Sequence, residues 1–95
     1  MIRLIPLLLL VSCGASPAPE FLRANRIDTT LNGRDYTVYH TDRRVEVIRL
    51  GYARRGEHQA IRADMIALAS SVPGCTLSER SLQGDSGEMR GNIRC

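Results

Sequence analysis

The chain has 95 residues, of which 43% are hydrophobic and only 4% aromatic, and tryptophan is absent. Such a length allows one small domain, and its core must be mainly aliphatic. All thirteen basic residues are arginines and ten residues are acidic, so the formal charge is only +3. This small excess comes without a nucleic-acid-binding motif, and we therefore expect no nucleic-acid partner.

The first twelve residues combine one positive charge with an apolar run. Arg3 precedes residues 4–11, which carry no polar side chain. A helix that spans a bilayer needs about 20 apolar residues, so this run is too short to cross. It fits the hydrophobic region of a secretory signal, which is about 7–15 residues long. We expect residues 1–12 to be a signal peptide.

The run ends in Leu10-Val11-Ser12-Cys13, which resembles the lipobox of bacterial lipoproteins. The resemblance implies that the thiol of Cys13 receives a diacylglycerol and that cleavage before it makes Cys13 the acylated first residue. The protein would then be anchored in the bacterial cell envelope and face the periplasm. Gly14, where an Asp would favour the inner membrane, points toward the outer membrane. The alternative is a buried segment with Cys13 as an ordinary core thiol.

Residues 13–25 are predicted to be a tether. The stretch 14–20 consists of small residues, two prolines and a glutamate without periodicity, as is typical of a flexible spacer. The folded domain is then expected over residues 26–95.

Cys75 and Cys95 are the two remaining cysteines. An oxidising compartment permits a disulfide between them, and closing a loop of about 20 residues should contribute about 3 kcal/mol. A zinc site would need more ligands than two cysteines supply, and a reactive pair would favour Cys-x-x-Cys spacing. We expect neither a metal nor a cofactor.

In the first half of the domain, apolar and polar residues alternate as is typical of β-strands. Strands are predicted over 36–40 and 45–50, with a weaker edge strand over 27–31. Asn32-Gly33 is a strong hairpin-turn signal because both residues tolerate positive φ.

The period then changes to that of a helix over residues 57–72. A stripe at helical spacing is expected to face the core, formed by Ile61, Met65, Leu68, Ala69 and Val72. Glu57 suits the positive end of the helix dipole, and Pro73-Gly74 ends the helix.

The last segment reads as a hairpin around Gly84-Asp85-Ser86-Gly87. A turn centred at Asp85 makes paired residue numbers add to 170, which places Cys75 opposite Cys95 and Leu77 opposite Ile93. A shift in register would spoil this pairing, although Gly91 could host a compensating bulge.

The predicted fold is α+β, a small β-β-α-β-β antiparallel sheet with one helix packed on it. The arrangement, in which Gly74-Cys75 follows the helix and Cys95 is the last residue of the last strand segment, resembles small uncharacterised proteins of alphaproteobacteria. That resemblance implies no activity.

Six arginines cluster in sequence and form a candidate patch for an anion or a partner. If they converge, they could bind an acidic partner, a lipid headgroup or a phosphorylated sugar. The alternative is a solvated face, which the interspersed Asp42, Glu46, Glu57 and Asp64 favour. The six are Arg43, Arg44, Arg49, Arg54, Arg55 and Arg62.

No catalytic set is evident. His58 has Glu57 beside it and Asp64 about two turns on, but a nucleophilic site would need a serine or cysteine within hydrogen-bond reach, and the sequence cannot place one there. The run 84–87 superficially resembles a serine-protease signature, yet the chain is far too short for that fold and a turn is favoured. His40 and His58 are expected to be partly exposed, and Tyr36, Tyr39 and Tyr52 to line the core rim with their hydroxyls in water.

We therefore expect a non-catalytic lipoprotein that contacts another envelope component. One alternative is a small periplasmic ligand-binding or enzymatic domain that uses the arginines with His58 and Glu57. Another is an inhibitor or immunity-type module that caps a partner with a sheet edge or hairpin.

Overall fold

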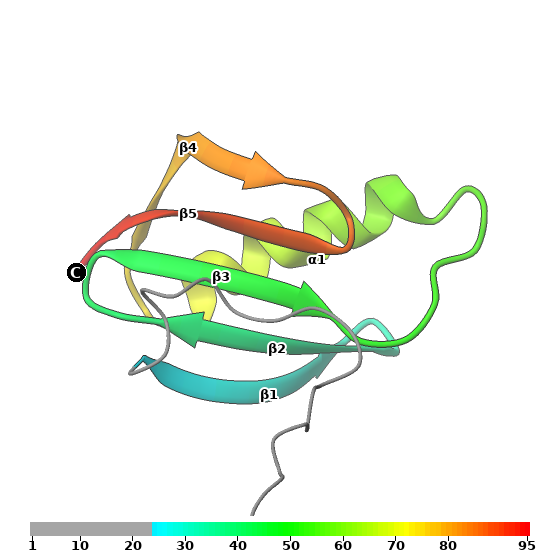
Figure 1. Cartoon of the computed structure of the whole chain (residues 1–95), viewed down its shortest axis with the longest axis horizontal. Helices are drawn as coiled ribbons and strands as arrows, with labels where there is room; N and C mark the ends of the chain where they lie inside the picture. The colour runs from blue at the N-terminus through cyan, green and yellow to red at the C-terminus, as the bar shows by residue number, and fades with distance from the viewer. Residues whose placement is uncertain (1–23) are drawn as a thin grey trace, which may run out of the picture.

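The computed structural model describes residues 24–95. Five strands form one antiparallel sheet in the order β1-β2-β3-β5-β4, and the single described helix packs on one face of it (Figure 1). This confirms the predicted α+β class. The elements are β1 (Asn25–Leu31), β2 (Arg34–His40), β3 (Arg44–Arg49), α1 (His58–Ser71), β4 (Thr76–Gly84) and β5 (Glu88–Arg94).

The hairpin of β1 and β2 is more regular than the sequence suggested. Asn32 and Gly33 have φ of 52° and 77°, as a two-residue type I′ turn requires. From that turn the two strands pair without interruption, from Leu31 opposite Arg34 to Asn25 opposite His40. The expected weak edge strand is therefore a full seven-residue strand, and three strands precede the helix.

The core lies between α1 and the sheet. The helix contributes Ile61, Met65, Leu68 and Ala69, all at most 5% exposed, while Val72 is partly buried. The helical stripe predicted from the sequence thus faces the core. The sheet side is built from Tyr36, Val38, Val45, Val47, Met89 and Ile93. Burying each large apolar side chain contributes about 1.5–3 kcal/mol.

The helix ends where the sequence predicts. Gly74 has a φ of +71°, and the amides of Gly74 and Cys75 both donate to the carbonyl of Ser70, at 3.0 and 3.2 Å. Glycine adopts this left-handed conformation without penalty, which makes it the usual helix-ending residue. The chain reverses there and enters β4. No helix within residues 24–95 is long and apolar enough to span a membrane.

The hairpin of β4 and β5 corrects the predicted turn. Near the turn Gly84 pairs with Met89, so its centre lies between Ser86 and Gly87 rather than at Asp85. A bulge then restores the expected register, because residues 79–82 of β4 face only Gly91 on β5.

Beyond the bulge, Leu77 pairs with Ile93 as predicted. The bulge adds three more residues to β4 than to β5, and these offset the displaced turn. The sulfur atoms of Cys75 and Cys95 therefore lie at disulfide-bonding distance, with their Cα atoms 4.6 Å apart.

Candidate functional site

The six arginines predicted to form a patch do not converge. Arg43 lies in the β2–β3 turn and Arg44 begins β3, whereas Arg49 is the last residue of β3, at its opposite end. Five residue steps along a strand amount to about 17 Å. Arg54 and Arg55 lie in the loop before α1, and Arg62 lies on the helix.

Two of these arginines hold the β4–β5 turn. The Arg49 guanidinium donates to the carbonyl of Ser86 at 2.9 Å, and the Arg49 backbone amide donates to the carbonyl of Gly87 at 3.0 Å. Arg62 reaches the carbonyl of Gly84 from α1, at 3.4 Å. These contacts fasten the turn to β3 and to the helix, so the two side chains have a structural role.

The same corner contains a serine–histidine pair. Nδ1 of His58 and Oγ of Ser86 are hydrogen-bonded at 2.5 Å. His58 is the first residue of α1 and is exposed, whereas Ser86 is only 8% exposed. The sequence showed both residues but not their contact, because 27 residues and two elements separate them. A serine within reach of a histidine is the minimum of a nucleophilic site.

The surroundings of this pair do not complete such a site. Acyl transfer needs hydrogen-bond donors, often backbone amides, that stabilise an oxyanion, and the nearby amides of Gly87 and Glu88 donate instead to the Asp85 carboxylate, at 2.8 and 3.3 Å. These two bonds lower the pKa of Asp85. Residues 85–87 thus lie in a turn, as the sequence favoured for this run, and the turn is closed by its own aspartate.

The two acids near His58 in sequence serve another residue. Asp64 accepts from the Arg34 guanidinium at 3.1 Å, and Glu57 lies 3.7 Å from the same guanidinium. Glu57 also accepts from the backbone amide of Arg54 at 2.9 Å, which is the main cause of its lowered pKa. Among the hydrogen bonds of residues 24–95, none joins His58 to a carboxylate that could orient it.

Asp64 is the centre of a buried polar cluster. It is 5% exposed and accepts from the Asn32 amide at 2.7 Å and from the Tyr36 hydroxyl at 2.9 Å, in addition to Arg34. We call Asn32, Arg34, Tyr36 and Asp64 the hairpin–helix cluster, because it joins the β1–β2 turn to α1. The expectation that Asp64 belongs to a solvated face was wrong.

The expected position of Tyr36 was also wrong. This tyrosine is fully buried, rather than on the core rim with its hydroxyl in water. Burial, followed by the hydrogen bond to Asp64, raises the pKa of Tyr36 to about 12. Tyr39 is half-buried and Tyr52 fully exposed.

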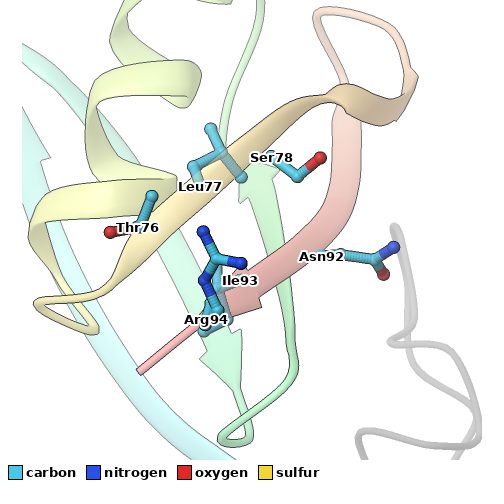
Figure 2. Close-up of a pocket in the computed structure, with 6 residues that line it drawn as sticks. All are labelled: Thr76, Leu77, Ser78, Asn92, Ile93 and Arg94. Carbon is cyan, nitrogen blue, oxygen red and sulfur yellow. The ribbon is translucent and has the colours of Figure 1, made fainter.

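A surface hollow of about 360 Å³ lies at the disulfide end of the sheet, between β4 and β5. Figure 2 shows the polar side chains of Thr76 and Asn92 pointing in opposite directions rather than toward a common centre. Arg94 is the one cation lining it, and none of the six predicted arginines does so. Without convergent polar groups, the hollow has little means of selecting a ligand.

The outer edge of β1 is the other exposed feature. Within the described residues β1 pairs only with β2, so its second edge has no strand beside it. Arg26, Ile27, Asp28 and Thr30 are exposed along it. Free strand edges are common sites for adding a strand from another chain.

No protein family, characterised relative or solved structure matches this chain. Any statement about function therefore has to rest on the chemistry of the chain's own residues. The predicted signal peptide, the predicted acylation of Cys13 and the part of the predicted tether up to residue 23 lie outside the described residues.

Proposed function

We propose that the protein is a lipid-anchored, non-catalytic module of the bacterial cell envelope, which holds its domain in the periplasm to contact another envelope component. The observation that carries this proposal is Leu10-Val11-Ser12-Cys13, placed directly after a short apolar run that begins behind Arg3. The same feature favours anchoring in the outer membrane, because no Asp follows Cys13.

Two further observations support the proposal. The sulfur atoms of Cys75 and Cys95 lie at bonding distance, and a disulfide suits an oxidising compartment outside the cytoplasm. The serine–histidine pair has its neighbouring amides bound to Asp85, so those amides serve the turn instead of an oxyanion.

The anchor is tested by the mass and membrane partition of the full chain expressed in a Gram-negative host. We expect the native protein to begin at Cys13, to carry acyl mass and to enter the detergent phase. Cys13→Ser should lose the acyl mass and keep its leader. The matched control is Cys75→Ser/Cys95→Ser, which should remain acylated. If Cys13→Ser leaves both the mass and the partition unchanged, the anchor is refuted.

The non-catalytic part is tested with activated esters. We expect the purified chain to hydrolyse p-nitrophenyl acetate no faster than Ser86→Ala, because both lack a free oxyanion site. A wild-type rate that Ser86→Ala abolishes, with His58→Ala behaving alike, would instead establish an enzyme.

The partner is sought by crosslinking in intact envelopes followed by mass spectrometry. We expect a covalent adduct with one envelope component in the acylated chain and its loss in Cys13→Ser, which does not reach the same membrane. Equal adducts in both chains would show that the contact needs no anchor.

A further inference from the structure

We infer that β1 pairs with β1 of a second copy of this chain, antiparallel and about a two-fold axis at Ile27, so that two sheets become one continuous sheet. This inference names a surface and a partner that the proposed function leaves open. It depends on the edge of the sheet and not on the lipid.

The hydrogen-bonding phase of β1 shows which of its groups face outward. The amide of Leu50 donates to the carbonyl of Asp35 at 2.9 Å, so Asp35 on β2 turns toward β3. Its neighbours on β2 therefore turn toward β1, because successive residues alternate. On β1, the residues opposite those neighbours direct their backbone amides and carbonyls toward β2. Thr29, which lies opposite Tyr36, is one of them.

The backbone amides and carbonyls of Arg26, Asp28 and Thr30 consequently point away from the sheet. The register with β2 is unbroken along the whole of β1, and the strand contains no proline and no bulge. Prolines and bulges are two of the devices by which edge strands avoid pairing. The pairing edge is uninterrupted, and Arg26, Asp28 and Thr30 are three successive outward-facing residues along it.

The hydrogen-bonding pattern and the charges together favour one register. The two strands can exchange hydrogen bonds only if outward-facing residues of one lie opposite outward-facing residues of the other. The two-fold axis must therefore pass through a residue position and not midway between two residues. An axis at Arg26 would oppose two arginines, and an axis at Asp28 would oppose two aspartates. An axis at Ile27 places Arg26 opposite Asp28 of the second copy, twice by symmetry. Opposite charges on paired positions stabilise a sheet, whereas like charges destabilise it.

The local contacts prepare both charged side chains for this pairing. Thr37 donates to the Asp28 carboxylate at 2.8 Å, and Arg26 lies 3.4 Å from the same carboxylate. Both side chains remain more than half exposed, at 59% and 62%. They share the face of the sheet that lies away from α1, so a second Arg26 can approach each Asp28.

Ile27 supplies the apolar part of the contact. It is 38% exposed and pairs with the buried Val38, so it lies on the helix-facing side of the sheet. The proposed axis stacks it on Ile27 of the second copy. A strand-to-strand contact of this length buries little surface, so we expect a weak dimer that is best detected by covalent trapping.

The register is tested with single cysteines in the full-length chain carrying Cys13→Ser, which removes the anchor and a competing thiol. Residues that face each other without exchanging hydrogen bonds have Cα atoms about 4.5 Å apart, within the range of a disulfide. Ile27→Cys should therefore form a covalent dimer under mild oxidation. Thr29→Cys should not, since its two copies would lie about 14 Å apart.

A mixed sample provides the positive control. Asn25→Cys and Thr29→Cys face each other in the proposed register, so together they should form a heterodimer that neither forms alone. If Thr29→Cys self-couples as readily as Ile27→Cys, or Ile27→Cys stays monomeric, the proposed pairing is wrong. Circular dichroism of each variant checks that the domain is folded.

The charge pairing is tested without new cysteines, by sedimentation over a concentration series. Asp28→Arg should weaken association about fivefold to tenfold, because it opposes like charges at two symmetric positions. Arg26→Asp/Asp28→Arg should restore association, since the pair is exchanged rather than removed. If the double variant stays as weak as Asp28→Arg, the charges do not set the register. Because all these chains lack the anchor, failure of the dimer leaves the lipid proposal untouched.

Discussion

The hydroxyl of Tyr36 on β2 donates a hydrogen bond of 2.9 Å to the carboxylate of Asp64 on α1, inside the interface between the sheet and the helix. Asn32 and Arg34 bring two further donors to that carboxylate. A buried carboxylate is costly unless it is paired and hydrogen-bonded. Three donors meet this need, and they fix the helix against the β1–β2 hairpin.

Removing the acceptor should therefore destabilise the domain. We expect Asp64→Ala to lower the free energy of unfolding by about 2–4 kcal/mol, because it leaves the buried Tyr36 hydroxyl without a partner and Arg34 without its closest anion. Urea unfolding followed by circular dichroism measures this loss. Glu79→Ala, at an exposed position of β4, is the matched control and should change stability by less than about 0.5 kcal/mol. Equal effects would contradict the role of the cluster.

Tyr36 should also make stability depend on alkaline pH. Its pKa is raised to about 12 in the folded chain, against about 10 when unfolded. The folded state thus holds the proton more tightly, and this contribution is complete below pH 10 and is lost as the pH rises toward 12. The expected loss is about 2 kcal/mol, measured by urea unfolding at several pH values.

Substitution at Tyr36 isolates this effect. Tyr36→Phe cannot ionise and should flatten the decline between pH 10 and 12. Tyr52→Phe, at a fully exposed position, should leave it unchanged. A decline that persists in Tyr36→Phe would assign the pH dependence to another group.

The bulge in β4 depends on the missing side chain of Gly91. A Cβ there would lie 3.0 Å from Cδ2 of Leu82 and 3.2 Å from Oγ of Ser81. We expect Gly91→Val to cost about 1–3 kcal/mol through overpacking. The neighbouring Asn92→Val, at an exposed position of the same strand, should be nearly neutral. Equal unfolding midpoints for the two variants would show that the bulge accommodates a branched side chain.

The cysteine pair should stabilise the domain covalently. We expect Cys75→Ser/Cys95→Ser to lower the free energy of unfolding by about 3 kcal/mol, because an open chain gains entropy on unfolding that a closed loop lacks. Reductant should lower the stability of the native chain to the same level and leave the double variant unchanged. Free thiols at both positions in the denatured, unreduced protein would refute the bridge.

Periodicity is local, so it could be read correctly from the sequence. The stripe from Ile61 to Ala69 repeats with the helical period and faces the core as expected. That stripe also contained the signal for the hairpin–helix cluster, because Asp64 lies three residues after Ile61 and one before Met65. The charge of Asp64 suggested solvent exposure, whereas its position in the helical period indicated burial.

The candidate site was harder to predict than the helix. His58 and Ser86 meet only because β5 pairs with β3 and α1 packs across both. Arg44 and Arg49 separate because a strand is extended: they are near in sequence but lie at the two ends of β3. Residues a few positions apart on an extended strand lie far apart in space, because each step along the strand advances the chain by about 3.3 Å.

The sequence by itself determined the helix with its apolar stripe and the turn at Asn32-Gly33, because each of these depends on a few adjacent side chains; the leader with its cysteine stays a prediction of the sequence. Only the tertiary structure decided which polar groups are buried together, where the last hairpin bends, and which strands form the two edges of the sheet. Those outcomes depend on contacts between segments distant in the chain, as the Tyr36–Asp64 bond and the bulge opposite Gly91 illustrate.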